Sequence, residues 1–104
     1  MTNKQYRQGD VFLRKIADLP ADAIERKPDG DRVVLAYGEV TGHAHAIDAS
    51  LAKMYSSGGK DYLEVQKGAR LRHEEHETLN LDPGFYEVIR QREYEHQGWR
   101  RVAD

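Results

Sequence analysis

Cysteine is absent from this sequence of 104 residues, and there are only three prolines and one tryptophan. Without cysteine the chain has no disulfide, no thiolate metal ligand and no cysteine nucleophile, so any bound metal must be held by nitrogen and oxygen. The sequence also lacks an apolar run of about 18 residues and an apolar signal-like segment at its N-terminus. We therefore expect a protein with no membrane partner and a cytoplasmic location.

An excess of charge of one sign is lacking as well. The chain has 16 Lys and Arg against 18 Asp and Glu, for a net charge of -2. Such a balance predicts no extended nucleic-acid surface. Apolar residues make up 38% of the sequence, which is enough for a folded core, and this length fits one domain spanning residues 1–104.

Short segments rich in β-forming residues alternate with turn signals along the chain. Pro28-Asp29-Gly30, Gly58-Gly59 and Pro83-Gly84 mark turns. Residues 17–30 are expected to be a connection with one helical turn. The expected strands are 10–16, 32–37, 43–47, 53–56, 61–66, 69–73 and 85–94, with a last short strand at 99–102. The pattern predicts an all-β domain, a small barrel or sandwich of about six to eight short antiparallel strands with at most one short helical segment.

Four of the five histidines stand in two short clusters, Gly42-His43-Ala44-His45 and His73-Glu74-Glu75-His76. Because alternate side chains of a strand share a face, the first two histidines should lie on one side together with Ile47. A turn after His73 would bring His76 beside it. We expect the two clusters to meet in the fold, and the predicted metal ligands are His43, His45, His73 and His76.

Neutral imidazole is a good ligand for several transition metals, so the expected cofactor is a divalent metal, with zinc as the first choice. Three histidines and an open position would form a catalytic site of the hydrolase type, with Glu74, Glu75 or Glu77 as the base. Four histidines would instead close the shell of a structural site, and the spacing does not distinguish these. Protonation below about pH 6.5 should release the ion.

The glycine and the His-x-His pair within residues 38–45, followed by His73, resemble the metal-binding motif of the cupin family. In that family a glycine precedes His-x-His on a barrel strand, and a later histidine completes the metal site. The resemblance covers less than half of the chain and implies a β-barrel with an internal metal site and a cupin-like enzyme. Two features differ from the family: residues 47–50 lack its glutamate, and Pro83-Gly84 follows the later histidine instead of preceding it.

A second polar run, Gln91-Arg92-Glu93-Tyr94 with His96, follows the last apolar strand segment. Arg92 could hold a phosphate or carboxylate and Tyr94 could donate a proton, so both are candidate catalytic residues for a small-molecule or phosphate-containing substrate. With two histidines as acid and base, they would suffice for metal-independent, ribonuclease-type cleavage. A third hypothesis is a non-catalytic ligand- or protein-binding module with structural histidines. The sequence does not predict an oligomeric state.

Overall fold

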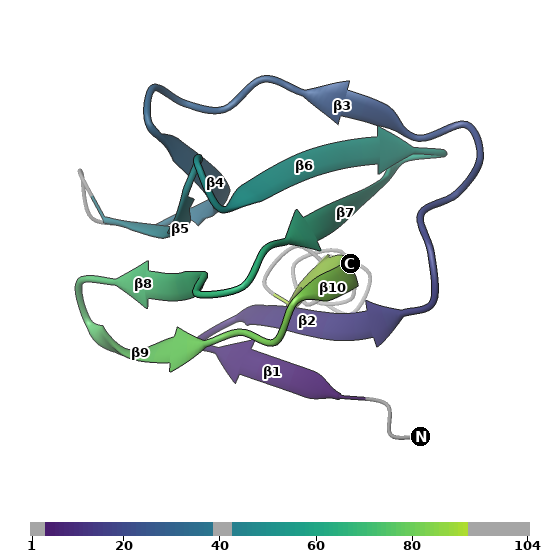
Figure 1. Ribbon diagram of the computed structural model, residues 1–104. Helices are drawn as coiled ribbons and strands as arrows, with labels where there is room; N and C mark the ends of the chain where they lie inside the picture. The colour runs from purple at the N-terminus through teal and green to yellow at the C-terminus, as the bar shows by residue number, and fades with distance from the viewer. Residues whose placement is uncertain (1–3, 39–42, 92–104) are drawn as a thin grey trace, which may run out of the picture.

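The computed structural model describes residues 4–38 and 43–91, and the elements it defines there are ten β-strands in two antiparallel sheets (Figure 1). The prediction of a small all-β fold of short antiparallel strands is confirmed, in the form of two sheets rather than a closed barrel. No helix among these residues is long and apolar enough to cross a membrane.

The larger sheet has six strands in the order β1-β2-β10-β7-β6-β3. Its members are β1 (Gln5–Gln8), β2 (Val11–Ile16), β3 (Ile24–Arg26), β6 (Ala52–Ser57), β7 (Lys60–Val65) and β10 (Gly84–Arg90). The smaller sheet has the order β4-β5-β8-β9. It contains β4 (Arg32–Tyr37), β5 (Ala44–Asp48), β8 (Arg70–His73) and β9 (His76–Asn80).

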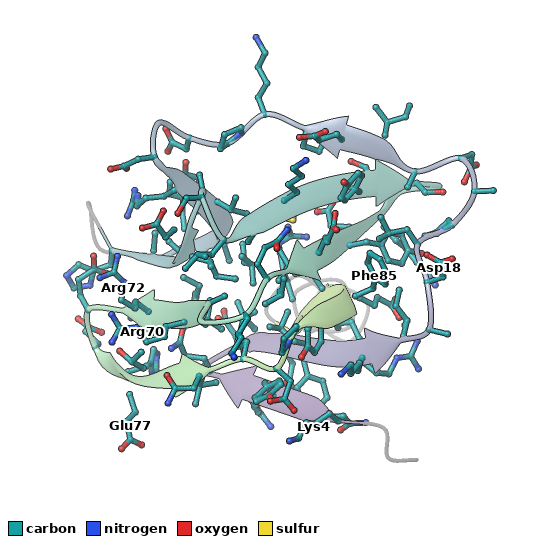
Figure 2. All side chains as sticks on the ribbon, in the orientation of Figure 1. Lys4, Asp18, Arg70, Arg72, Glu77 and Phe85 are labelled. Carbon is teal, nitrogen blue, oxygen red and sulfur yellow. The ribbon has the colours of Figure 1, made fainter. Side chains whose placement is uncertain are left out.

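One apolar core is formed by strands of both sheets. Period-two alternation selects its members, since inward and outward side chains alternate along a strand. In β8, Leu71 is fully buried while Arg70 and Arg72 are exposed, as the sequence predicted (Figure 2). The largest fully buried side chains are Tyr86, Leu13, Leu35, Ile47, Leu63, Leu71 and Val11.

Three strands were not predicted, and all three lie at sheet edges: β1, β3 and β9. An edge strand has a neighbour on one side only and tolerates polar sequence, so its hydrophobic pattern is weak. The helical turn expected within 17–30 was wrong. That segment has a tight turn, in which the Ala23 N–H donates to the Pro20 carbonyl at 3.0 Å, followed by β3 and by a second turn in which the Arg32 N–H donates to the Asp29 carbonyl at 3.2 Å.

The strand predicted for residues 85–94 is described as β10 up to Arg90. Positions 92–94 and the expected strand at 99–102 lie outside the described residues. The number of strands is also higher than the predicted range, because the three edge strands add to those that the sequence indicated.

The two sheets meet where β1 passes beside β9 (Figure 1). The Gln8 side-chain amide donates to the Glu77 carbonyl at 2.9 Å, and the Asp82 N–H donates to the Tyr6 hydroxyl at 3.1 Å. The N-terminal hairpin of the larger sheet is thereby fastened to the last hairpin of the smaller one. The histidine clusters lie at this junction.

Candidate metal centre

Three histidines lie on three neighbouring strands of the smaller sheet, β5, β8 and β9. His73 and His76 face each other across the β8–β9 hairpin, where Glu74 and Glu75 form the turn. Strand β5 pairs with β8 through Ala46 and Arg72. Because antiparallel register proceeds one residue forward on one strand and one back on the other, His45 then lies alongside His73.

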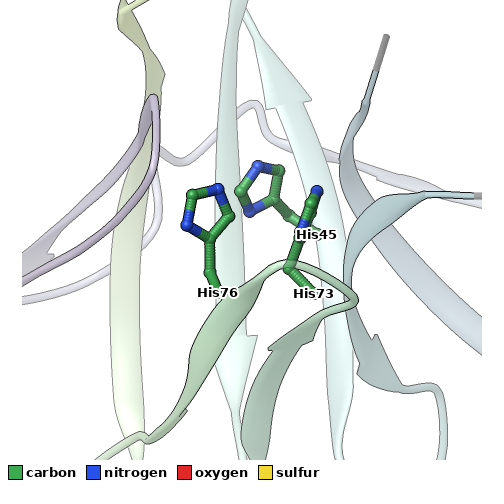
Figure 3. A group of neighbouring side chains, drawn as sticks. All are labelled: His45, His73 and His76. Atoms are coloured by element: carbon green, nitrogen blue, oxygen red, sulfur yellow. The ribbon is translucent and has the colours of Figure 1, made fainter. Parts of the chain in front are cut away.

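The imidazole rings approach one another closely (Figure 3). The ring centroids of His45 and His73 are 4.3 Å apart, those of His73 and His76 are 4.6 Å apart, and those of His45 and His76 are 5.7 Å apart. One nitrogen from each ring lies within 4.8 Å of the other two. Nitrogens around tetrahedral zinc are roughly 3.3 Å apart. Small rotations, for which the exposed His76 has the most room, would therefore bring the three onto one ion.

The buried side chain of Gln8 determines which ring nitrogen of the buried His45 carries the proton. The Gln8 amide nitrogen donates to the carbonyls of Leu71 and Glu77, both at 2.9 Å. Only the NH₂ end of an amide can donate, so Gln8 Oε1 must be the atom that lies 2.8 Å from His45 Nδ1. His45 Nδ1 therefore carries a proton, and in the neutral ring the lone pair is on Nε2.

His45 Nε2 lies beside the side chain of Asp10. The carboxylate oxygen Oδ1 is 3.4 Å from Nε2, and the Asp10 side chain is 27% exposed while that of His45 is 4% exposed. Asp10 follows Gly9 in the two-residue turn between β1 and β2, across which Gln8 pairs with Val11. One hairpin therefore contacts both ring nitrogens of His45.

His73 is hydrogen-bonded within its own hairpin. The Glu75 N–H donates to His73 Nδ1 at 3.0 Å. A metal bound at Nδ1 would take the lone pair that accepts this bond, and a metal bound at Nε2 would require the proton to be on Nδ1. Ligation through either nitrogen therefore removes this hydrogen bond.

Gly9 leaves the space into which His76 points. Its φ of 57° is in the left-handed region that favours glycine. A Cβ at this position would lie 2.7 Å from His76 Nε2 and 3.3 Å from His45 Cε1. The backbone conformation therefore favours glycine here, and a larger residue would displace the His76 ring.

The fourth predicted ligand, His43, stands beside the group but outside it. Its ring centroid is 5.8 Å from that of His73, and its Nδ1 is 3.2 Å from Glu75 Oε2. His43 precedes β5, where its carbonyl accepts from the Gly38 N–H at 2.8 Å, whereas His45 and Ile47 are buried within the strand. The structure thus brings three of the four predicted ligands together.

The predicted bases Glu74 and Glu75 hold the β8–β9 turn against the start of β5. Glu74 Oε1 accepts the Ala44 N–H at 3.0 Å, and this hydrogen bond lowers the pKa of the carboxyl group. Glu75 contacts His43. The side chain of Glu77 points away from the ribbon (Figure 2).

The second polar run is only partly described, because Arg92, Tyr94 and His96 lie outside the described residues. Nearby Arg90 is engaged in the fold: its Nε donates to the Leu35 carbonyl at 2.7 Å, and its Nη2 lies 2.7 Å from Asp61 Oδ2.

Sequence reasoning missed Gln8, Gly9 and Asp10. A signal for them was present, since Gly-Asp is a favoured two-residue loop of a β-hairpin. Reading Gly9-Asp10 as such a loop would have predicted β1 and placed Gln8 on a strand. Its contact with His45 depends on the distant pairing of β8 with β9 and has no local signal.

Residues 7–91 match the family described as Domain of unknown function (DUF8820). No curated protein and no solved structure matches the chain.

Proposed function

This chain belongs to the DUF8820 family, and we propose that it is a metal-binding domain in which His45, His73 and His76 hold one divalent ion. The proposed ion is zinc. Imidazole ligands suit zinc and other transition metals. They do not suit calcium or magnesium, which prefer oxygen ligands.

The observation that carries this proposal is the contact between His45 and Gln8. Histidine ligands in metal sites almost always donate their second ring N–H to a protein acceptor, which fixes the tautomer and orients the ring. His45 has this arrangement, with Nδ1–H donating to Gln8 Oε1 at 2.8 Å. Its Nε2 lone pair is thus oriented before any ion arrives.

The reaction class that fits such a centre is metal-assisted hydrolysis of a small-molecule or phosphate-containing ester. When bound by three histidines, zinc lowers the pKa of a bound water to near 7. His76 is exposed and His73 is partly exposed, so a substrate could approach from their side. Glu75, whose side chain is 60% exposed beside His43, is the proposed base.

The test compares His76, which belongs to the three-histidine group, with His43, which lies outside it. Untagged protein is analysed for metal, stripped with a chelator and titrated with zinc by calorimetry. We expect one zinc per chain, with His76→Ala binding at least about tenfold more weakly. His43→Ala is the control and should bind within about twofold of the wild type. Absence of zinc binding, or equal losses in the two variants, would contradict the proposal.

Hydrolysis is tested separately, on generic phosphomonoesters, phosphodiesters and carboxylic esters. The zinc-loaded protein should hydrolyse at least one of these classes faster than the chelator-treated protein, and His76→Ala should lose that difference. Equal rates with and without zinc would contradict the proposed hydrolysis. They would not bear on zinc binding, which the titration tests.

A further inference from the structure

A cavity of about 580 Å³ lies between β3 and β4, the outermost strands of the two sheets on the side away from β1 and β9. Residues of β3, β4, β6, β7 and β10 line it. Small-molecule sites in proteins have volumes of roughly 300–1,000 Å³, so the cavity has the size of such a site. Its lining residues, all in the described part of the chain, do not include the three clustered histidines.

The core-facing side of the larger sheet changes from apolar to charged at this cavity. Residues that pair across antiparallel strands share a face. The register places Arg26 beside the buried Met54, and Asp61 beside the buried Val88. Arg90 follows Val88 by two residues in β10 and has the same face. Three charged residues thus stand where the alternation of the sheet predicts apolar ones, and such exceptions are typical of functional sites.

Two of these charged side chains form a partly buried ion pair inside the cavity. Arg90 Nη2 lies 2.7 Å from Asp61 Oδ2. Arg90 Nε also donates to the carbonyl of Leu35 on β4 at 2.7 Å, which ties β10 to the smaller sheet. The pair is therefore fixed in position, and its opposite charges largely compensate each other.

The other charged residues give the cavity an excess of one positive charge. Its lining contains three cationic residues, of which Arg26 and Lys27 are exposed, and two acidic residues, Asp61 and Glu25. Glu25 pairs with Tyr55 and so lies on the other face of the sheet from Arg26. The charge at the cavity entrance therefore favours a ligand with one negative charge.

Apolar side chains form another part of the wall. Ile24 is 70% exposed at the entrance, and Val33 and Met54 belong to the core. An apolar part of a ligand that covers Ile24 would remove this side chain from water, which is favourable.

Strand β3 is a poor template for an added peptide strand, although it is a sheet edge (Figure 1). It has three residues, and Lys27 and Pro28 follow it directly. Short edge strands, lysine and proline all discourage strand addition. The cavity therefore favours a small molecule over a peptide.

We infer that this cavity binds a small monocarboxylate with an apolar body. Arg26 holds the carboxylate, for which a guanidinium offers two parallel N–H donors, and Lys27 adds a second positive charge. Ile24, Val33 and Met54 contact the apolar body. This inference is independent of the proposed metal centre.

Titration with octanoate and with phenylacetate, followed through the amide NMR signals, tests the inference. The protein is treated with chelator beforehand, so that the carboxylates have no zinc to bind. We expect saturable shifts at Arg26 and Val34 and none at Leu79 on β9. Octylammonium, which has the opposite charge, and acetate, which lacks the chain, should each bind at least about tenfold more weakly than octanoate. The inference is overturned if neither carboxylate saturates, or if octylammonium binds as tightly as octanoate.

Three variants assign the charge. Arg26→Gln should weaken octanoate binding at least about fivefold, because it removes the charge that holds the carboxylate. Arg70→Gln makes the same change at an exposed position of β8 and should stay within about twofold of the wild type (Figure 2). Asp61→Asn removes a negative charge from the cavity and should bind octanoate at least as tightly as the wild type. Unchanged affinity in Arg26→Gln, or an equal loss in Asp61→Asn, would contradict the inference.

A second copy of the chain is the alternative occupant that the same measurement detects. If the amide signals of Arg26 and Val34 shift when the protein is diluted without any carboxylate, the cavity is an interface between copies, and the inference is overturned.

Discussion

His45 Nδ1 lies 2.8 Å from Gln8 Oε1, although the two residues are 37 positions apart in the sequence. Gln8 also donates to two carbonyls of the β8–β9 hairpin, so one buried amide links the strand of His45 to the hairpin of His73 and His76. The side chain that orients one histidine therefore also positions the other two.

Replacing Gln8 with leucine should destabilise the fold. The substitution removes the hydrogen bonds of Gln8 to His45 Nδ1 and to the carbonyls of Leu71 and Glu77, and a buried polar group that loses its hydrogen bond costs about 1–3 kcal/mol. These costs are not additive, and we expect a loss of at least about 2 kcal/mol in the free energy of unfolding, measured with urea. Gln66→Leu, on an exposed residue, should change it by less than about 0.5 kcal/mol. Equal effects in the two variants would show that the amide network is not important for stability.

Gly9→Ala and Gly58→Ala form a matched pair. The φ angles are 57° and 58°, so both substitutions incur a similar backbone strain of about 1 kcal/mol. Only at Gly9 would the new Cβ meet a histidine, because the space around Gly58 is open. Both variants should therefore melt lower, whereas zinc affinity should fall only in Gly9→Ala. Calorimetric titration of both variants checks this, and unchanged affinity in Gly9→Ala would mean that His76 Nε2 is not near the ion.

Zinc binding should break the hydrogen bond between the Glu75 N–H and His73 Nδ1. The Glu75 N–H donates to His73 Nδ1 at 3.0 Å, and ligation through either nitrogen of His73 removes that bond. We expect a large shift of the Glu75 amide signal on adding zinc and faster hydrogen exchange at this position. The Leu81 amide, which donates to the Ala69 carbonyl at 3.0 Å, is the internal control and should not change. A static Glu75 signal in zinc-saturated protein would exclude His73 as a ligand.

The ionised Glu74 carboxylate should stabilise the folded protein, and protonation of Glu74 at low pH should remove this stabilisation. The hydrogen bond from Ala44 lowers the pKa of this carboxyl group, so its stabilising effect is present above the unfolded value of 4.5 and is lost as the pH falls through the lower folded value. Glu74→Gln keeps an acceptor for Ala44 but has no such titration. In chelator-treated protein, the wild type should melt higher than Glu74→Gln at pH 6, and the difference should shrink as the pH falls below about 4.5. A difference that is constant from pH 6 to pH 3 would contradict this.

The strands in which buried and exposed side chains alternate could be predicted from the sequence. Strand β8 alternates arginine with buried Leu71, and the His-x-His spacing placed His45 on the same face as Ile47. The edge strands were not accessible in this way. Strand β1 is Gln-Tyr-Arg-Gln and is stabilised by its neighbours rather than by its own pattern.

The site was predictable only in part, for the same reason. The turn after His73 could be anticipated from the spacing, and it does bring His76 opposite His73. The separation of His43 from the group depends on β5 beginning one residue later. The role of Gln8 depends on carbonyls 63 and 69 residues away, which no local pattern reports. Metal binding itself stays a prediction.

An anomalous difference map at the zinc edge, from crystals grown with one equivalent of zinc, tests the central claim most directly. We predict one strong peak about 2.1 Å from a ring nitrogen of each of His45, His73 and His76, with Nε2 as the ligand atom of His45. A peak between His43 and Glu75, or no ordered zinc near the three rings, would contradict it.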